Sequence, residues 1–388
     1  MRTFIRKRNF IIVICLFAAT AQSCKATSYY FPKFGTPIVS DHHIVFAGAG
    51  LQSDRLICIS RSKGEKLWEV EDKGHILKPW FIMDEKLVVT KDSDIYQCDF
   101  SSGDLKLMYK SGLTKCGLEY LESMHVLLRG EKDDVDFLCC VDLKQSKELW
   151  RVSGVHSTIA RSPKILCVQK ATRKKTSVDT YTLTDVQICG LRVDDGKICW
   201  TQKDSYNSLF PEGVTRKEYF VVELSGAVKC YRQKDGTVLN SIIFGRTRGV
   251  SICPYKSDVL AWIQVHFKVP PVDKFSYDES LFKKLNRHVI YSLSVPELEK
   301  REVFKPDWFA STARTYDDII IGNTVGKIFA YDITTGKKIW EGGQWNWSGI
   351  HDSYIYYSKH EHNGDSTTIN QINVTTGERK KLYEELLP

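Results

Sequence analysis

Short apolar segments alternate with polar turns along most of this chain of 388 residues. The clearest copy runs from Lys327 to Trp340, and it reads as a strand, a tight turn at Thr335-Gly336 and a second strand. Glycine at such a position supplies the positive φ that tight turns often need. The pattern therefore predicts β-hairpins.

The hairpin recurs at a regular spacing. The turns of its eight copies fall at residues 64, 103, 146, 196, 236, 297, 336 and 377. Another apolar segment precedes each copy, as at Leu87–Val89, and a further short strand fits before it. Four strands per repeat make a propeller blade, and blades stack around an axis to bury their faces. The sequence predicts an all-β fold, an eight-bladed β-propeller of four-stranded antiparallel blades, with seven blades as the alternative.

The motif of the clearest copy resembles the pyrroloquinoline-quinone-type propeller repeat. Its strand ends in Ala-x-Asp, followed by a Thr-Gly-Lys turn and then a tryptophan, and the matching residues are Ala330, Asp332, Thr335, Gly336, Lys337 and Trp340. Four of the eight copies keep the tryptophan, and the resemblance spans nearly the whole chain. It implies a propeller, and one member of that superfamily is an outer-membrane assembly lipoprotein of about this length with a signal peptide.

The N-terminus has the pattern of a targeting segment. A run of basic residues precedes ten apolar residues, Phe10–Ala19, which are too few to span a bilayer but suit a signal peptide. We expect a signal peptide over residues 1–21, or 1–23 if Cys24 is lipidated and tethers the protein to a membrane. An N-terminal membrane anchor is the alternative. Residues 22–35 would form a tether, and residues 36–388 a single propeller domain.

Cleavage would change the charge. Loss of Arg2, Arg6, Lys7 and Arg8 takes the formal charge from +8 to +4, because no acidic residue leaves with them. A mildly basic mature chain argues against nucleic acid as the partner. We expect an exported protein, either periplasmic or anchored to a membrane as a lipoprotein.

Several cysteines align with a small residue of the repeat. The slot of Ala330 is assigned to Cys58, Cys98, Cys140 and Cys230. Since cysteine behaves as a small hydrophobe, these four are expected to be packing residues rather than disulfide partners. The expected reason is close packing of adjacent blades.

Two other cysteine pairs need separate treatment. Cys139-Cys140 sits in mid-strand, where neighbouring side chains point to opposite faces, so a vicinal disulfide is not expected. Cys167 and Cys189 are the better candidate pair, although sequence cannot establish connectivity.

Motifs for catalysis are missing from the sequence. It contains no nucleotide-binding glycine loop, Gly-x-Ser-x-Gly elbow or Cys-x-x-Cys pair. His360 and His362, with His351 and Asp365 near them in sequence, form the one histidine cluster, and we interpret it as a polar hairpin loop. The eight repeats leave little chain for the calcium ligands and carboxylate of a quinone enzyme. The sequence therefore predicts no enzyme, no cofactor and no metal site.

Two insertions break the repeat, near residues 170–185 and 264–287. Both are expected to be loops between second and third strands, and hence on one face of the ring, opposite the Thr-Gly turns. Asp278 could cap a short helix in the second insertion. Long loops on a rigid scaffold are common recognition sites, although they could also be tolerated surface insertions. The candidate partner-binding residues are Lys170, Arg173, Lys174, Lys175, Phe275, Tyr277, Leu281 and Phe282.

These features predict a non-catalytic scaffold of the cell envelope that binds a protein partner through the insertion-bearing face. An assembly factor is the first version of this hypothesis. The alternatives are an immunity or inhibitor protein that neutralises a toxin or enzyme, and a quinone-dependent dehydrogenase-like enzyme.

For closure of the ring, Lys380–Glu384 can supply the fourth strand of the last blade. Alternatively, Ser28–Phe31 could add to that blade and lock the ring.

Overall fold

The computed structural model describes most of the chain from residue 37 onward. The described ranges are residues 37–47, 55–73, 75–121, 124–175, 181–203, 211–244, 247–265, 287–308, 310, 312–324, 327–342, 347–360 and 366–386. Within these ranges, no helix has the length and apolar character needed to cross a membrane. The predicted signal peptide, the tether and Cys24 lie outside them.

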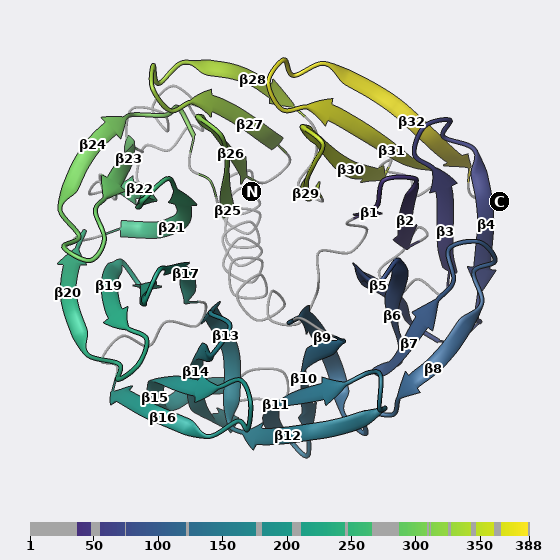
Figure 1. Cartoon of the computed structure of the whole chain (residues 1–388). Coiled ribbons are helices and arrows are strands. Elements are labelled where there is room, and N and C mark those ends of the chain that lie inside the picture. The colour runs from purple at the N-terminus through teal and green to yellow at the C-terminus, as the bar shows by residue number, and fades with distance from the viewer. Residues whose placement is uncertain are drawn as a thin grey trace, which may run out of the picture.

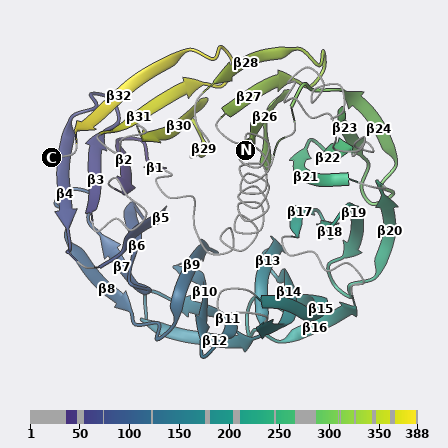
Figure 2. The same cartoon turned by 180° about the vertical axis from the view of Figure 1, so that it is seen from behind.

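Eight antiparallel sheets of four strands each are arranged in a ring around a common centre (Figures 1 and 2). In every sheet the four strands follow one another in sequence, from the innermost to the outermost. The prediction of an eight-bladed β-propeller is therefore confirmed, and the seven-blade alternative is wrong.

Blades one to eight follow one another along the chain, and each contributes one strand to every level of the ring. The innermost strands are β1 (Ile38–Val39), β5 (Leu77–Met83), β9 (Thr114–Tyr120), β13 (Val155–Arg161), β17 (Glu212–Arg216), β21 (Thr247–Tyr255), β25 (Thr312–Tyr316) and β29 (Trp347–His351). The second strands are β2 (His43–Ala47), β6 (Lys86–Lys91), β10 (His125–Lys132), β14 (Ile165–Lys175), β18 (Tyr219–Leu224), β22 (Asp258–Val265), β26 (Ile319–Thr324) and β30 (Tyr354–His360). The third strands are β3 (Arg55–Ser60), β7 (Asp94–Cys98), β11 (Val135–Asp142), β15 (Tyr181–Arg192), β19 (Ala227–Arg232), β23 (Arg287–Leu293), β27 (Lys327–Asp332) and β31 (Ser366–Asn373). The outermost strands are β4 (Lys66–Glu71), β8 (Leu105–Tyr109), β12 (Lys147–Ser153), β16 (Ile198–Lys203), β20 (Val238–Ile243), β24 (Lys300–Phe304), β28 (Lys338–Gly342) and β32 (Arg379–Leu386).

This order gives the ring two distinct faces. The turns between first and second strands, and those between third and fourth strands, lie on one face, which we call the turn face. The connections between second and third strands, and those between blades, lie on the other, which we call the loop face.

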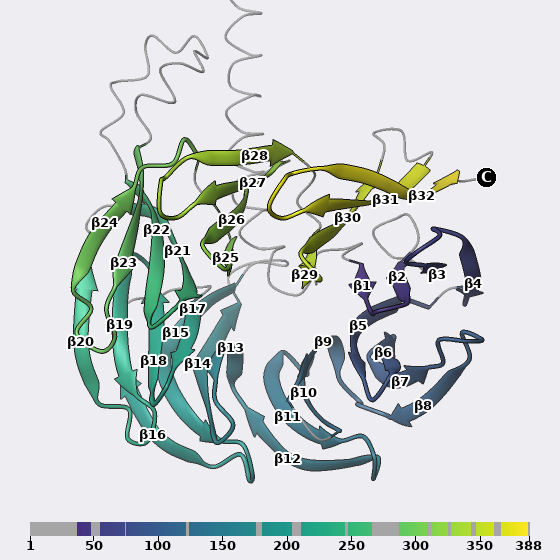
Figure 3. The ribbon, with the colours of Figure 1, turned by 45° about the horizontal axis from the view of Figure 1, so that its top comes forward.

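The ring closes between blades one and eight, which lie side by side (Figure 3). Strand β32 completes blade eight, as predicted for Lys380–Glu384. Blade one likewise contains only β1 to β4. The described strands therefore close the ring by packing, without exchanging a strand. The alternative closing segment Ser28–Phe31 lies outside the described residues.

Each pair of neighbouring blades shares its own hydrophobic core. Eight clusters of buried residues are present in the described chain, and each draws its members from two adjacent blades. The core at the closing boundary includes Ile44 and Phe46 of blade one and Tyr356 and Ile369 of blade eight. A blade has two apolar faces, so every blade buries both faces only when the ring is complete.

Outer-strand tryptophans join one blade to the next. The indole Nε1 groups of Trp68, Trp150 and Trp340 each donate a hydrogen bond of 2.7 Å to a backbone carbonyl of the following blade. Trp200 makes the same bond at 2.6 Å. The acceptors lie three residues before the turn glycine or its equivalent and are Phe100, Val193, Val374 and Gln233.

The small slot of the repeat is confirmed for Cys58, Cys140 and Cys230, which are buried, free and directed toward the next blade. Within blade four, the equivalent Gly190 lies under the ring of Trp200, where an added Cβ would come 2.2 Å from the indole. In that blade, a tryptophan of the same sheet thus restricts side-chain size, in addition to any effect of the neighbouring blade.

The assignment of Cys98 to this slot is wrong. Its side chain faces the preceding blade and joins the same core as Cys58. The β-bulge of blade two falls between Ile95 and Tyr96, whereas that of blade one falls directly after Cys58. Cys98 lies five residues before its turn glycine Gly103, whereas Cys58 lies six residues before Gly64. Cys98 therefore sits one residue beyond the slot, and neighbouring strand residues face opposite sides.

The candidate disulfide between Cys167 and Cys189 is also wrong. Both cysteines are free and fully buried. Cys167 is paired in register with Gly190, and Cys189 with Val168, so the two thiols lie on opposite faces of the sheet and in different cores. Cys139 and Cys140 are free for the same reason, as expected for neighbours in a strand.

Candidate functional site

The first insertion forms a β-ribbon on the loop face. Strands β14 and β15 pair well beyond the other strands of their blade, from Lys170↔Gln187 through Arg173↔Leu183 to Lys175↔Tyr181. The prediction of a loop over residues 170–185 is therefore wrong for all but residues 176–180, which lie outside the described residues. Threonines in both arms favour extended structure, because β-branched side chains suit strands.

Arg173 fixes this ribbon to blade three. Its Nη1 lies 2.7 Å from Glu131 Oε2, and its Nη2 lies 2.7 Å from Asp136 Oδ1. The three side chains are at most 10% exposed. His156 Nδ1 lies 2.9 Å from the second oxygen of Asp136, and Lys115 reaches Glu131 at 3.4 Å. Removing one member of such a buried ionic network leaves its partners uncompensated, so the network holds the ribbon in one orientation.

The two sides of the ribbon have different environments. Arg173 and its register partner Leu183 are on the buried side. Lys174 and its register partner Thr182 are on the opposite side and are exposed. The ribbon therefore presents polar side chains, including the positive charge of Lys174, to solvent while its other side is held against the ring.

The structure places the predicted partner-binding residues as follows. Lys170 is half-buried, Lys174 is exposed and Lys175 is the last residue of β14. Arg173 is engaged in the buried network rather than exposed. The candidates of the second insertion, as well as Asp278, lie in residues 266–286, outside the described residues, and they are Phe275, Tyr277, Leu281 and Phe282. Partner binding by this set stays a prediction.

A cavity of about 430 Å³ lies at the centre of the ring, against the innermost strands of blades three to seven. Its charged lining residues are Glu119, Arg161 and Arg216. Burial raises the pKa of Glu119, although the charges of Arg129 and Arg161 oppose that change. Burial also lowers the pKa of the Arg216 guanidinium, whose Nε donates a hydrogen bond to the carbonyl of Asp258.

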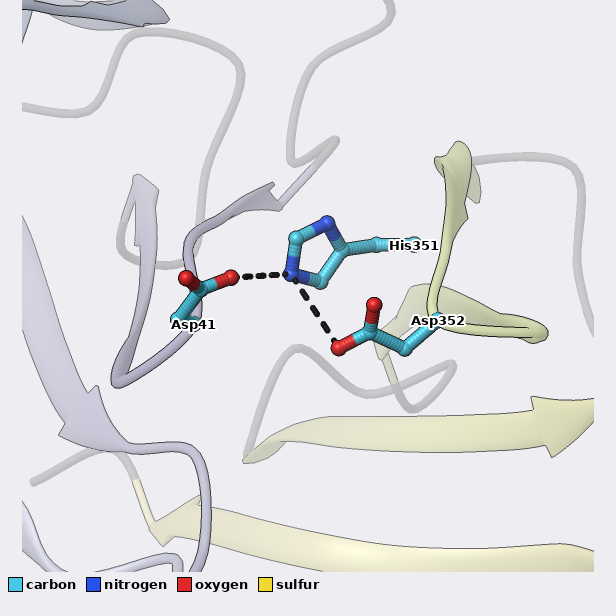
Figure 4. A group of neighbouring side chains, drawn as sticks. All are labelled: Asp41, His351 and Asp352. Atoms are coloured by element: carbon cyan, nitrogen blue, oxygen red, sulfur yellow. Dashed lines mark ion pairs between the residues drawn. The ribbon is translucent and has the colours of Figure 1, made fainter.

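The polar hairpin loop expected around His360 and His362 lies largely outside the described residues. His360 ends β30, and His362 and Asp365 lie outside the described residues. His351 instead faces Asp41 and its own neighbour Asp352 across the boundary between blades eight and one (Figure 4). The sequence analysis missed both aspartates.

Comparison with known proteins gives structural neighbours only. No protein-family model matches this chain, and no curated protein sequence matches it. The crystal structure of Sqt1 from Saccharomyces cerevisiae is similar at 10% identity with a TM-score of 0.56, over 92% of this chain and 98% of that one. BamB from Moraxella catarrhalis is similar at 10% identity with a TM-score of 0.54, over 85% and 92%.

A computationally designed protein, Ika8, is a third neighbour. It is 14% identical with a TM-score of 0.55, over 80% of this chain and 85% of its own. Identities this low establish the fold alone. The propeller architecture is thus shared with BamB, whereas membership of the pyrroloquinoline-quinone-type repeat family stays a prediction.

Proposed function

We propose that this protein is a non-catalytic scaffold that binds a protein partner through its loop face, with the ribbon of β14 and β15 as the contact. The observation that carries the proposal is the fixation of the ribbon by Arg173 to Glu131 and Asp136. A contact element held in one orientation before binding loses less conformational entropy when the partner docks. Its exposed Lys174 favours a partner with an acidic surface.

Propeller neighbours support the scaffold class without supplying a partner. We propose an assembly factor of the cell envelope similar to BamB, the assembly lipoprotein noted above. This version also includes export by a signal peptide of residues 1–23 and attachment through a lipidated Cys24. It predicts that a Cys24→Ser variant is released from the membrane fraction, whereas the wild type remains there. Retention of that variant would contradict the tether.

The main test is affinity capture from envelope extracts of the host with a ribbon variant. Replacing residues 174–182 by Asn-Gly keeps the Arg173↔Leu183 pair and closes it with a two-residue hairpin turn. We expect the variant to fold like the wild type and to lose the partner. Capture of the same partner by wild type and variant would contradict a contact through the ribbon.

A charge-matched pair of variants refines the test. Lys174 and Lys337 are both exposed, but Lys174 lies on the ribbon and Lys337 follows a turn-face glycine. We expect Lys174→Glu to weaken capture and Lys337→Glu to leave it unchanged. Equal loss in both variants would indicate a general charge effect.

The identity of the captured protein separates the versions of the proposal. Components of an outer-membrane assembly machine support the BamB-like version, and a single toxin or enzyme supports an immunity or inhibitor protein. Incubation with calcium and pyrroloquinoline quinone decides the enzyme alternative. Quinone absorbance retained after gel filtration would contradict a non-catalytic scaffold.

A further inference from the structure

Three side chains that can bind a metal meet where the ring closes. Asp41 lies in the turn after β1, His351 is the last residue of β29, and Asp352 lies in the turn that follows β29. Both turns belong to the turn face, so this group is separate from the ribbon on the loop face. Figure 4 shows the imidazole between the two carboxylates, with one of its ring nitrogens directed at both.

The distances define a compact group. His351 Nε2 lies 3.3 Å from Asp41 Oδ1 and 3.7 Å from Asp352 Oδ2, and all three ligand atoms lie within 4.8 Å of one another. Among the described residues, Nε2 of His351 is buried and has no hydrogen-bond partner. A buried nitrogen that faces two carboxylates without a hydrogen bond to either lacks the contact that would normally satisfy it.

Corresponding turns at other blade boundaries are joined directly. Lys256 Nζ of blade six lies 2.7 Å from Asp318 of blade seven, and the hydroxyls of Tyr316 and Ser353 are hydrogen-bonded between blades seven and eight. Only at the closing boundary, among the described residues, do ligand atoms of a histidine and two carboxylates all lie within 4.8 Å of one another. This boundary is also the one that joins the two ends of the ring.

We propose that Asp41, His351 and Asp352 form a binding site for a divalent metal ion of the zinc class, which links blade eight to blade one. In a tetrahedral zinc site with ligand distances of about 2.0–2.1 Å, the ligand atoms stand about 3.3–3.5 Å apart. The two separations from His351 Nε2, 3.3 and 3.7 Å, are close to that range, and the two carboxylate oxygens lie within 4.8 Å of each other. A water molecule would complete the four ligands, and the imidazole favours zinc over calcium or magnesium.

Arg61 holds the ligand Asp352 in place and limits the affinity of the site for a metal ion. Its Nη1 lies 2.9 Å from Asp352 Oδ2, and its Nε donates to the Tyr356 hydroxyl at 2.7 Å. A carboxylate has enough lone pairs to accept the guanidinium and bind a metal at the same time, and such outer contacts orient metal ligands. The positive charge of Arg61 opposes a cation, however, so we expect a dissociation constant in the micromolar range.

The experiment is titration of the untagged full-length protein with Zn²⁺ alone, by isothermal calorimetry and thermal unfolding. We expect a component of one zinc per chain and a rise in Tm. Asp41→Asn removes an anionic ligand from an exposed turn and should weaken this component at least tenfold, as should His351→Ala. His75→Ala is the matched control. His75 Nδ1 pairs with Asp92, but this histidine is not part of the group of three ligands. The His75→Ala variant should therefore bind zinc like the wild type.

Two results would overturn the site. One is the absence of saturable zinc binding below about 1 mM in the wild type. The other is zinc binding that survives in both Asp41→Asn and His351→Ala, which would place the ion on other histidines. Far-ultraviolet circular dichroism of the Asp41→Asn variant tests whether the variant is folded, so that a loss of zinc binding can be attributed to the missing ligand. The partner-capture assay is independent of this result, because the proposed partner contact is on the other face.

Discussion

The indole of Trp200 in blade four covers Gly236 in the turn of blade five. A Cβ added to Gly236 would lie 2.4 Å from the ring, and the residue has a φ of 68°. The same relationship joins Trp68 to Gly103, Trp150 to Gly196 and Trp340 to Gly377. Glycine is required at these turns both for its backbone conformation and for the space that the tryptophan occupies.

Two turns of the ring carry a larger residue at this position. Ser146 and Leu298 have φ values of 52° and 56°. They follow blades two and five, in which Leu107 and Asn240 stand four residues after the turn glycine, in place of a tryptophan. Asn240 Nδ2 still donates a hydrogen bond to the Pro296 carbonyl of the next blade. A side chain is tolerated in these turns because the preceding blade has no indole above them.

Substitution of this glycine tests the relationship. We expect Gly236→Ala to lower the free energy of unfolding by about 2–4 kcal/mol, because it combines a left-handed backbone with overpacking against Trp200. Ser146→Ala is the control, with a Cβ already present in the same backbone region, and it should change stability by less than about 1 kcal/mol. Urea denaturation measures both. Equal effects would mean that the indole does not restrict the turn.

Removal of the ion pairs by which Arg173 clamps the ribbon to blade three should lower the stability of the protein. We expect Arg173→Ala to lower the free energy of unfolding by about 3–5 kcal/mol, because the buried Glu131 and Asp136 lose the guanidinium that pairs with both of them. Lys174→Ala changes the adjacent, exposed residue and should have an effect within about 0.5 kcal/mol. Chemical denaturation followed by fluorescence compares the two. A cost below about 1 kcal/mol for Arg173→Ala would contradict the clamp.

The buried Glu223 is expected to make the stability of the protein depend on pH. Burial raises its pKa from 4.5 to about 7, and the charge of Glu212, its cross-strand register partner, acts in the same direction. The folded state therefore binds a proton that the unfolded state releases. The contribution of Glu223 to the free energy of unfolding is fully present below about pH 4.5. It declines as the pH rises to about 7, by at most about 3 kcal/mol.

Glu223→Gln should remove that decline, since the amide is neutral and its oxygen can still accept the Gly226 N–H. We expect the variant to match the wild type near pH 4 and to be more stable by about 1–3 kcal/mol at pH 8. Glu299→Gln, at an exposed carboxyl, is the control. Stability curves of Glu223→Gln and wild type that run parallel from pH 4 to 8 would contradict the burial effect.

Thiol reactivity tests the packing role of the cysteines. Of the ten cysteines described, Cys199 is exposed and nine are buried, and none is paired. Burial raises the pKa of Cys58 and Cys230 to about 12, so they hold little of the reactive thiolate at neutral pH. Unpaired thiols are unusual in oxidising compartments, and for an exported protein burial would have to protect them.

We expect Cys199 to be labelled rapidly in the native protein at pH 8, and the Cys199→Ser variant to have one rapidly labelled thiol fewer. The nine buried thiols should react only after unfolding. Peptide mapping of the labelled protein assigns each site. Recovery of a disulfide between Cys167 and Cys189 from non-reduced protein would contradict their placement on opposite faces of the sheet.

The blade count could be predicted because the same physical unit is repeated eight times. In the four copies that keep the tryptophan, it stands four residues after the turn position, as Trp340 does after Gly336. The side that Cys98 faces follows from the spacing to the turn, because Cys98 lies five residues before Gly103, whereas Cys58 lies six before Gly64. A shift of one residue in a strand reverses the side of the sheet.

The sites depended on contacts that sequence spacing does not reveal. Arg173 is basic and lies in a polar insertion, and only the neighbouring Glu131 and Asp136 make it part of a buried network. Asp41 and His351 are 310 positions apart in the sequence. Their proximity follows from closure of the ring, and a repeat pattern does not specify which turns meet at that boundary.

Closure without strand exchange has a consequence for the order of the chain. Since every blade is a consecutive run of four strands, the ring could be cut between any two blades and its present ends joined by a linker. A circular permutant that begins at Glu212 of β17 would still contain eight whole blades and all eight shared cores. The order of the strands within each blade therefore does not require the polypeptide to begin at blade one.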